Sequence, residues 1–390
     1  VRSPFAGVNH PTHSEAIARV KDQIPGGVSN IAFAWIFTTQ SVADDLLALR
    51  QGLDGEGPFS WIRDIYPARF DSIEDLGTDR DGDGSMADKG VPEDPKDHRF
   101  ILQPEFLAEV LSPASMLDAG LENLEFEAVD HFVFGWVESP DFRDPEDGAL
   151  HINYQSGEVH HSKGRVPFIL SVPKATKEHK PPFPVIIYSH GATTSRLEQL
   201  AVIGDMAARG FAMAGIDAVG HGPIGGKVED LLSQAADEVP DLLLMSFITH
   251  LGKTLLTPDY DAAGKTLEEG LQDLEESGVW RAVLVDGRAE DIDGDGLTLS
   301  GDGFFNPNPF VLNANSRQTL VDTMMLLRTL MRFDSEQIPE GIETPRDASD
   351  AELMEHVLNG DFNADGVLDV GGPGNRYYAM GTSLGGIHTS

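Results

Sequence analysis

The sequence of 390 residues contains no cysteine. Disulfide bonds, thiolate nucleophiles and cysteine-ligated zinc are therefore excluded. Positive charge is scarce, because 28 lysines and arginines stand against 64 aspartates and glutamates, for a formal net charge of −36. A nucleic acid or an anionic membrane surface binds to a basic face, so this charge argues against both as partners. Long apolar runs are lacking too, since none in the sequence reaches the length of a bilayer-spanning helix.

The composition nevertheless supports a folded core. Hydrophobic residues make up 40% of the chain, so the acidity does not indicate a disordered protein. A solvated acidic shell is typical of proteins that meet salt outside the cell. We therefore expect a secreted, periplasmic or cell-surface location.

The middle of the chain predicts a strand–helix–strand unit. Residues 184–188 and 211–216 are short continuous apolar runs, typical of strands buried on both faces. Between them, residues 196–209 place apolar side chains at helical spacing, and Gly210 follows. This order predicts parallel strands, so the expected fold class is α/β with a parallel sheet.

Other segments extend this pattern along the chain. Helices are expected over residues 14–21, 42–51, 266–276 and 316–333, and strands over residues 30–39, 129–137, 151–154, 166–172 and 377–381. We divide the chain into a mixed N-terminal region (1–125), the first part of the sheet core (126–222), a large lid-like insertion (223–309) and the resumed core (310–390). The apolar residues 242–248 in the insertion predict either the buried side of a lid helix or a surface for acyl chains.

A nucleophile-elbow motif lies near the end of the sequence. Residues 381–385 are Gly-Thr-Ser-Leu-Gly and match Gly-x-Ser-x-Gly. In such a strand-to-helix turn the serine backbone is strained, and glycine on either side allows neighbouring backbone to approach closely. The start of the helix directs N–H groups at an oxyanion. The motif therefore predicts Ser383 as a nucleophile, with an ordinary turn serine as the alternative.

Together with its upstream loops, the motif resembles the α/β-hydrolase superfamily of esterases and lipases. Residues 188–191, Tyr-Ser-His-Gly, are similar to its oxyanion loop, and residues 217–222, Asp-Ala-Val-Gly-His-Gly, to its Asp-x-x-Gly-His-Gly turn. Residues 35–41 resemble the end of the N-terminal domain of large bacterial virulence-factor lipases. The resemblance implies an α/β-hydrolase core, incomplete in this chain. It also implies an oxyanion hole made by the N–H groups of Ala192 and Leu384 and supported by His190 and Gly191.

The histidines near this motif do not complete a triad. The resemblance gives His190 and His221 structural hydrogen-bonding roles, and His388 follows Ser383 too closely to be the catalytic base. In this fold the triad order is Ser, then Asp or Glu, then His, but only seven residues follow Ser383. We therefore expect the acid and the base in a C-terminal part of the same protein beyond Ser390, which would associate with this chain.

Three acidic loops share an alternating spacing. They contain Asp79, Asp81, Asp83 and Asp88; Asp291, Asp293, Asp295 and Asp302; and Asp361, Asn363, Asp365 and Asp369. In each loop a glycine follows the third of these residues and permits a sharp turn. Hard oxygen ligands in this number suit Ca²⁺. The loops predict structural calcium ions, with solvated acidic turns as the alternative.

The function that these features favour is a serine carboxylic ester hydrolase, an esterase or lipase. Ser383 would attack the carbonyl of a small-molecule or lipid ester, and water would hydrolyse the acyl-enzyme. Another serine acyl hydrolase (a thioesterase, peptidase or acyltransferase) remains an alternative. A non-enzymatic, calcium-stabilised surface or adhesion protein on a hydrolase fold is the second alternative.

Overall fold

The computed structural model describes residues 43–71, 101–115, 124–223, 241–255, 259–275, 280–290, 298–305, 307–342 and 350–389, together with Arg19, residues 21–23 and Pro25. Contacts divide the chain into two units, Val1–Asp45 and Leu46–Ser390. The first unit includes a short 3₁₀ helix, η1 (Lys21–Gln23). The predicted strand over residues 30–39 lies outside the described residues, as does most of the predicted helix over residues 14–21. The sheet and the candidate site belong to the second unit.

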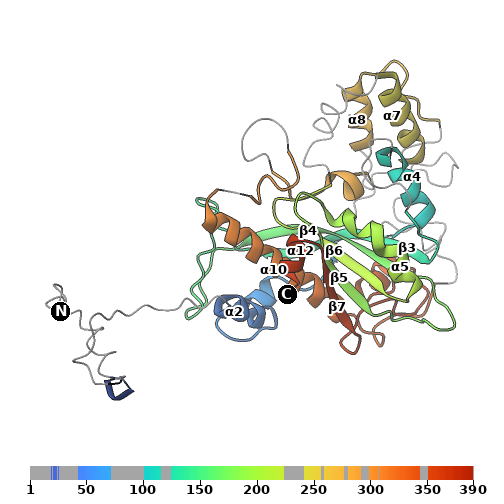
Figure 1. Cartoon of the computed structure of the whole chain (residues 1–390). Coiled ribbons are helices and arrows are strands. Elements are labelled where there is room, and N and C mark those ends of the chain that lie inside the picture. The colour runs from blue at the N-terminus through green and yellow to red at the C-terminus, as the bar shows by residue number, and fades with distance from the viewer. Residues whose placement is uncertain are drawn as a thin grey trace. The chain divides into compact units, whose positions relative to one another are not determined.

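The described strands of the second unit form one seven-stranded sheet in the order β1-β3-β4-β6-β5-β7, with β2 also pairing with β3 (Figure 1). The strands are β1 (Phe70–Asp71), β2 (Ile101–Leu102), β3 (Val129–Asp141), β4 (Ser162–Pro173), β5 (Val185–Ser189), β6 (Ala212–Ile216) and β7 (Tyr377–Gly381). The protein is therefore mixed α/β. The predicted strands at residues 129–137, 166–172, 184–188, 211–216 and 377–381 are confirmed.

The prediction of a parallel sheet holds for only part of it. Strand β5 is parallel to both β6 and β7, but β4 is antiparallel to both β3 and β6. The reason for the error is that a buried apolar run carries no signal for its direction, so β4 looks the same in either orientation. The sheet is consequently mixed, with its parallel part at the β6-β5-β7 end.

The predicted strand at residues 151–154 is also wrong. This segment makes only an isolated bridge between Asn153 and Glu158. The side-chain oxygen of Asn153 accepts hydrogen bonds from the N–H groups of Gln155 and Ser156, both at 3.2 Å. A side chain that binds its own backbone in this way favours a turn over a strand ladder.

Helices cover both faces of the sheet (Figure 1). On one face, α5 (Leu200–Ala208), preceded by the 3₁₀ helix η4 (Arg196–Gln199), packs against Ile186 and Met213. On the other face, α10 (Pro309–Met331) packs against Val185 and Ile187. Neighbouring residues of β5 thus point to opposite faces, as strand geometry requires. All five residues of β5 are buried, which explains its continuous apolar sequence.

The remaining helices lie around this core. They are α2 (Asp44–Leu53), α3 (Trp61–Ile65), α4 (Pro104–Ser115), α7 (Asp241–Leu255), α8 (Leu267–Glu275), the π-helix η5 (Arg281–Val285), α11 (Asp350–Leu358) and α12 (Leu384–His388). In the predicted insertion, Ile248 of α7 and Leu274 of α8 join one hydrophobic cluster with Leu107 of α4. Ile248 is fully buried, as the interpretation of this segment as the buried side of a helix expects. None of the helices in the described ranges is long and apolar enough to cross a membrane.

Candidate active site

Three loops meet at one edge of the sheet. They follow β6, β5 and β7, which are adjacent and parallel. Because parallel strands end at the same edge, the loops that begin at His190, Asp217 and Thr382 lie together. The chain continues from β5 to β6 on one side, whereas β7 lies on the other side. In open α/β sheets, ligands bind in the crevice at such a reversal of strand order.

Ser383 occupies a strained turn between β7 and α12. Its φ is 50° and its ψ is −110°, a conformation that side-chain-bearing residues rarely adopt. A Cβ added at Gly381 would collide with the carbonyl oxygen of Gly385, and one added at Gly385 would collide with that of Ser189. The Thr382 N–H donates to the Ser189 carbonyl oxygen at 3.1 Å, which ties this turn to β5. The turn therefore has the backbone geometry that the motif predicts.

The Ser383 side chain is exposed. Within the described ranges, its hydroxyl makes no hydrogen bond, and the backbone N–H groups of Ala192 and Leu384 donate to no acceptor. A Cβ at Gly191 would lie 3.6 Å from the carbonyl oxygen of Thr382, so the predicted oxyanion loop is next to the elbow. The structure thus brings Ser383, Gly191 and Thr382 together. The predicted oxyanion donors, the N–H groups of Ala192 and Leu384, have no acceptor among the described residues.

Glu198 holds the oxyanion loop in place. Its carboxylate accepts hydrogen bonds from the Gly191 N–H and from the Thr194 hydroxyl, both at 2.6 Å. The sequence analysis missed this residue. The signal was present, because Ser195 and Glu198 have the spacing of a capping box, which places a glutamate beside the residues that precede a helix. Ser195 does act as the N-cap, since its hydroxyl accepts from the Leu197 N–H at 3.3 Å.

His190 is buried beneath the same loop. Its Nε2 accepts a hydrogen bond from the Ala218 N–H at 2.9 Å, and its Nδ1 donates to the Gly191 carbonyl oxygen at 2.7 Å. Both ring nitrogens therefore bind backbone, one in each of two neighbouring loops. This arrangement supports the structural role expected for His190.

His221 and His388 are buried as well. The Nδ1 of His221 donates to the Val219 carbonyl oxygen at 2.9 Å, and the Nδ1 of His388 lies 3.3 Å from the Ser189 hydroxyl. Burial lowers the pKa of each to about 4. A histidine with such a low pKa accepts a proton poorly at neutral pH, so neither is suited to activate a hydroxyl.

A buried ion pair links the loops after β5 and β6. The guanidinium of Arg196 pairs with the carboxylate of Asp217, and both side chains are fully buried. The Arg196 N–H also donates to this carboxylate, at 2.6 Å, and Nη2 of Arg196 donates to the Ala282 carbonyl oxygen at 2.5 Å. Arg196 therefore connects two loops of the candidate site with the insertion.

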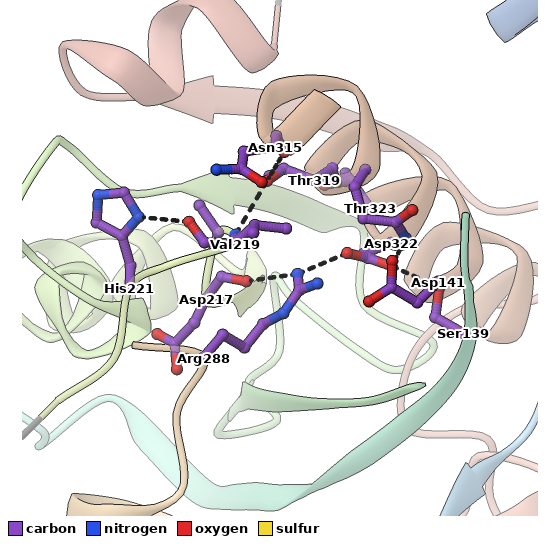
Figure 2. Close-up of polar contacts among 12 residues, drawn as sticks. Ser139, Asp141, Asp217, Val219, His221, Arg288, Asn315, Thr319, Asp322 and Thr323 are labelled. Atoms are coloured by element: carbon purple, nitrogen blue, oxygen red, sulfur yellow. Dashed lines mark hydrogen bonds and ion pairs between the residues drawn. The ribbon is translucent and has the colours of Figure 1, made fainter. Parts of the chain in front are cut away.

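A second polar network attaches the loop after β6 to α10 (Figure 2). Nη1 of Arg288 lies 2.5 Å from a carboxylate oxygen of Asp322 and donates to the Asp217 carbonyl oxygen at 3.3 Å. The other oxygen of Asp322 accepts from the Ser139 hydroxyl at 2.5 Å. Farther along, the Val219 N–H donates to the Thr319 hydroxyl at 3.1 Å. These hydrogen bonds satisfy buried polar groups and also hold the loop after β6 against α10.

The end of the insertion contacts both loops. The Gly301 N–H donates to the Gly220 carbonyl oxygen at 2.8 Å, and the Ser300 hydroxyl donates to the Thr194 carbonyl oxygen at 2.7 Å. The ring of Phe304 lies 5.2 Å from that of His221. The end of the insertion is therefore hydrogen-bonded to the loops that follow β5 and β6.

The predicted calcium loops are described only in part. The first, with Asp79, Asp81, Asp83 and Asp88, lies outside the described residues, as do Asp291, Asp293 and Asp295 of the second. Asp302 is described, in the turn that also contains Gly301. Among the residues that are described, no group of three or more acidic or histidine side chains is placed to hold one metal ion.

The third loop is described throughout. The carboxylate of Asp361 accepts from the N–H groups of Asp365 and Gly366, at 3.1 and 2.8 Å, and it pairs with Nδ1 of His356 at 2.6 Å. Asn363 accepts from the Asp365 N–H at 3.2 Å. Asp369 is buried separately and accepts from the Phe362 N–H at 2.8 Å. The oxygen donors of Asp361, Asn363 and Asp365 thus share one tight turn, whereas Asp369 faces another backbone group.

Comparisons with known proteins add little to this description. No protein-family model matches the chain, and no curated protein matches it either. One solved structure, described as the thioesterase domain from the curacin biosynthetic pathway, is similar to this chain at 12% identity. The match covers 62% of this chain and 95% of that one, with a TM-score of 0.15. A TM-score this low does not establish a shared fold. A function is therefore inferred from the turn at Ser383 and the loops beside it.

Proposed function

We propose that the chain is the nucleophile-bearing part of a serine ester hydrolase with an α/β-hydrolase core. The observation that carries the proposal is the backbone of Ser383, whose positive φ is maintained between two glycines at the carboxyl edge of parallel strands. Strain of this kind persists only where the surrounding structure enforces it, and it is concentrated at functional sites. An ordinary surface turn does not require a serine with a positive φ.

The chemistry proposed is acyl transfer. The Ser383 oxygen attacks the carbonyl carbon of a small-molecule or lipid ester, and the carbonyl oxygen becomes an oxyanion. The N–H groups of Ala192 and Leu384, which have no acceptor among the described residues, would donate to that oxyanion. A general base takes the proton of the Ser383 hydroxyl and gives it to the leaving alcohol, and water then hydrolyses the acyl-enzyme.

The base and the acid are proposed to come from a C-terminal part of the same protein beyond Ser390. Supporting this, His190 uses both ring nitrogens on backbone groups, and His221 and His388 have pKa values of about 4. Within the described ranges, β7 pairs only with β5, so its other edge is available for a further strand. Loops after such a strand would face the same edge of the sheet as Ser383.

Fluorophosphonate labelling tests this proposal. The reagent should attach covalently to Ser383 in the complete protein, as located by mass spectrometry of the labelled peptide. Ser383→Ala should abolish labelling and ester hydrolysis. Ser60→Ala is the matched control, because Ser60 is also exposed and its side chain caps no helix N–H. Labelling and hydrolysis that persist in Ser383→Ala would remove this serine from the mechanism.

We further propose that the three acidic loops bind structural calcium, in keeping with a secreted, periplasmic or cell-surface protein. The third loop supports this, because oxygen donors at Asp361, Asn363 and Asp365 lie on one turn that Gly366 closes with φ 84°. Oxygen ligands on alternate positions are the donor set that calcium takes. Bound calcium would neutralise the repulsion among these side chains and stabilise the fold.

A further inference from the structure

A hollow of about 470 Å³ lies between α2, α3 and the C-terminal half of α10, away from the candidate active site. Its lining is made of ten residues from these helices and the turns that follow them: Arg50, Leu53, Asp54, Arg63, Asp64, Met324, Leu327, Arg328, Met331 and Arg332. Four of the ten are arginines and two are aspartates, which leaves an excess of two positive charges. This excess is notable in a protein whose formal net charge is −36.

The two aspartates are already paired with the arginines of the rim. Arg50 lies 3.5 Å from the carboxylate of Asp54, and Arg63 lies 3.4 Å from that of Asp64. All four side chains are at the surface, so these pairs are weak and leave the guanidinium groups accessible. A bound anion could therefore pair with Arg50 or Arg63, because weakening these surface ion pairs costs little free energy.

The two arginines at the end of α10, Arg328 within it and Arg332 just after it, bind neutral groups instead. Arg328 donates to the Tyr66 carbonyl oxygen at 2.9 Å, and Arg332 donates to the Ala68 carbonyl oxygen at 3.3 Å. Within the described part of the chain, neither makes an ion pair. Each guanidinium has five N–H donors, so these bonds fix the side chains and leave donors for a ligand. Burial, and then the positive charge of Arg332, lower the pKa of Arg328, while the charge of Asp54 opposes the shift.

The guanidinium of Arg63 lies close to the backbone of Gly55. Gly55 has φ 81°, and a Cβ added there would collide with the Arg63 guanidinium. Arg63 also donates to the Asp54 carbonyl oxygen at 3.4 Å. The turn after α2 thus lets the Arg63 guanidinium lie against its backbone at the rim of the hollow.

The floor of the hollow is apolar. Leu53 is almost fully buried there, and Met324 and Leu327 contribute partly buried side chains. Met331 is 37% exposed at the margin, although it is a large apolar residue. Charged donors around an apolar floor are the arrangement of a site that binds an organic anion by its head and by a short hydrocarbon part.

We propose that this hollow binds a small amphipathic oxyanion, a carboxylate, sulfate or phosphate that carries a short aliphatic chain. The head would accept hydrogen bonds from Arg63, Arg328 and Arg332, since planar guanidinium groups bind oxyanions with two parallel bonds. The chain would cover Leu327 and Met331. The inference is independent of the proposed hydrolase function. Arg328 follows Thr319 by nine residues of α10, so the hollow is about 13 Å farther along the helix than the contact with the loop after β6.

Isothermal titration calorimetry of the full chain with four probes tests the proposal. Octanoate and octyl sulfate, below their aggregation concentrations, should bind at one site, with affinity falling as salt rises. Inorganic phosphate should bind at least about tenfold more weakly, because it lacks the chain. Octanol should bind more weakly still. Equal binding of octanol and octanoate would overturn the role of the arginines, and equal binding of phosphate and octanoate would overturn the role of the apolar floor.

Variants locate the site. Arg63→Gln and Arg332→Gln should each weaken octanoate binding by about tenfold or more, as expected for the loss of a charge-assisted bond. Arg332→Lys, which keeps the charge, should recover part of that loss. Met331→Ser should weaken octanoate but leave phosphate unchanged. Arg209→Gln is the control, since Arg209 is an exposed arginine of the same kind, paired with Asp205 on α5. Octanoate affinity that is unchanged in all the pocket variants, with thermal melts like the parent, would place the ligand elsewhere and refute the proposal.

Discussion

The guanidinium of Arg196 and the carboxylate of Asp217 form an ion pair whose two side chains are fully buried. The pair joins the helix that follows the loop after β5 to the first residue after β6. The same carboxylate accepts the Arg196 N–H, and the same guanidinium reaches the Ala282 carbonyl oxygen in the insertion. This one ion pair therefore links two loops of the candidate site.

Removing one partner of this pair should be strongly destabilising. Arg196→Met leaves the Asp217 carboxylate buried without its counter-charge, and a loss of about 3–5 kcal/mol in the free energy of unfolding is expected. Urea denaturation monitored by circular dichroism measures it. Arg209→Met is the control, because its pair with Asp205 is exposed and should contribute less than about 1 kcal/mol. Equal losses in the two variants would contradict the special role of the buried pair.

The strain at Ser383 predicts a stability difference between two substitutions. Ser383→Ala keeps a Cβ at φ 50°, whereas Ser383→Gly removes it. The glycine variant should be more stable than the alanine variant by about 1 kcal/mol, after the entropy cost of glycine in the unfolded chain is deducted. Thermal and urea unfolding of the two variants give the comparison. An alanine variant as stable as the glycine variant would show that the turn is not strained.

Stability should also decline in mild acid because of His388. Burial, followed by the charges of His190 and His221, lowers its pKa to about 4, against about 6.5 in an unfolded chain. Between these values the unfolded state binds the proton and the folded state does not, so the free energy of unfolding falls as pH decreases from 6.5 toward 4. Above pH 6.5 the histidine is neutral in both states and has no such effect.

His388→Gln should flatten this pH dependence by up to about 1.4 kcal/mol per pH unit, the value for one proton. Urea unfolding at several pH values between 4 and 7 measures the slope. His151→Gln is the control, because the hydrogen bond that its ring N–H donates to the Asp147 carboxylate raises the pKa of that exposed histidine, so its removal should not flatten the slope. A slope that is the same in the parent and in His388→Gln would mean that the pKa of His388 is not lowered in the folded protein.

The sequence predicted those parts of the fold that depend on local patterns. The strands β5, β6 and β7 are continuous apolar runs, and the turn at Ser383 follows from the spacing of Gly381 and Gly385. Periodicity also located α10, although the observed helix begins at Pro309, several residues earlier than predicted. In each of these cases the necessary information lies within a few neighbouring residues.

Features that depend on distant residues could not be predicted in the same way. The orientation of β4 is fixed by its pairing with β3 and β6 rather than by its own apolar residues. Nothing local pairs Arg196 with Asp217 or Arg288 with Asp322, because each bond requires the completed sheet. The role of Glu198 is intermediate, since its capping-box spacing is local but its contact with Gly191 arises from the loop conformation.

Calcium binding can be tested separately at the third acidic loop. Asp365 is exposed, and its carboxylate accepts a hydrogen bond only from the Val367 N–H and the Asn363 side chain among the described residues. Asp365→Ala should therefore fold, while removing one oxygen donor from the turn. We expect calorimetry to show one fewer bound calcium ion per chain than in the parent. Asp205→Ala, an exposed aspartate on α5, should leave the number unchanged.

The same site should affect stability by mass action. A ligand that binds only the folded state at one hundred times its dissociation constant stabilises by about 2.7 kcal/mol per site. Millimolar calcium should accordingly raise the melting temperature of the parent, a chelator should lower it, and Asp365→Ala should respond less than Asp205→Ala. Magnesium should act weakly, because it requires a tighter octahedral arrangement than alternating loop oxygens provide. A parent protein whose melting temperature is unchanged by both chelator and calcium would contradict the calcium sites and leave the loops as solvated acidic turns.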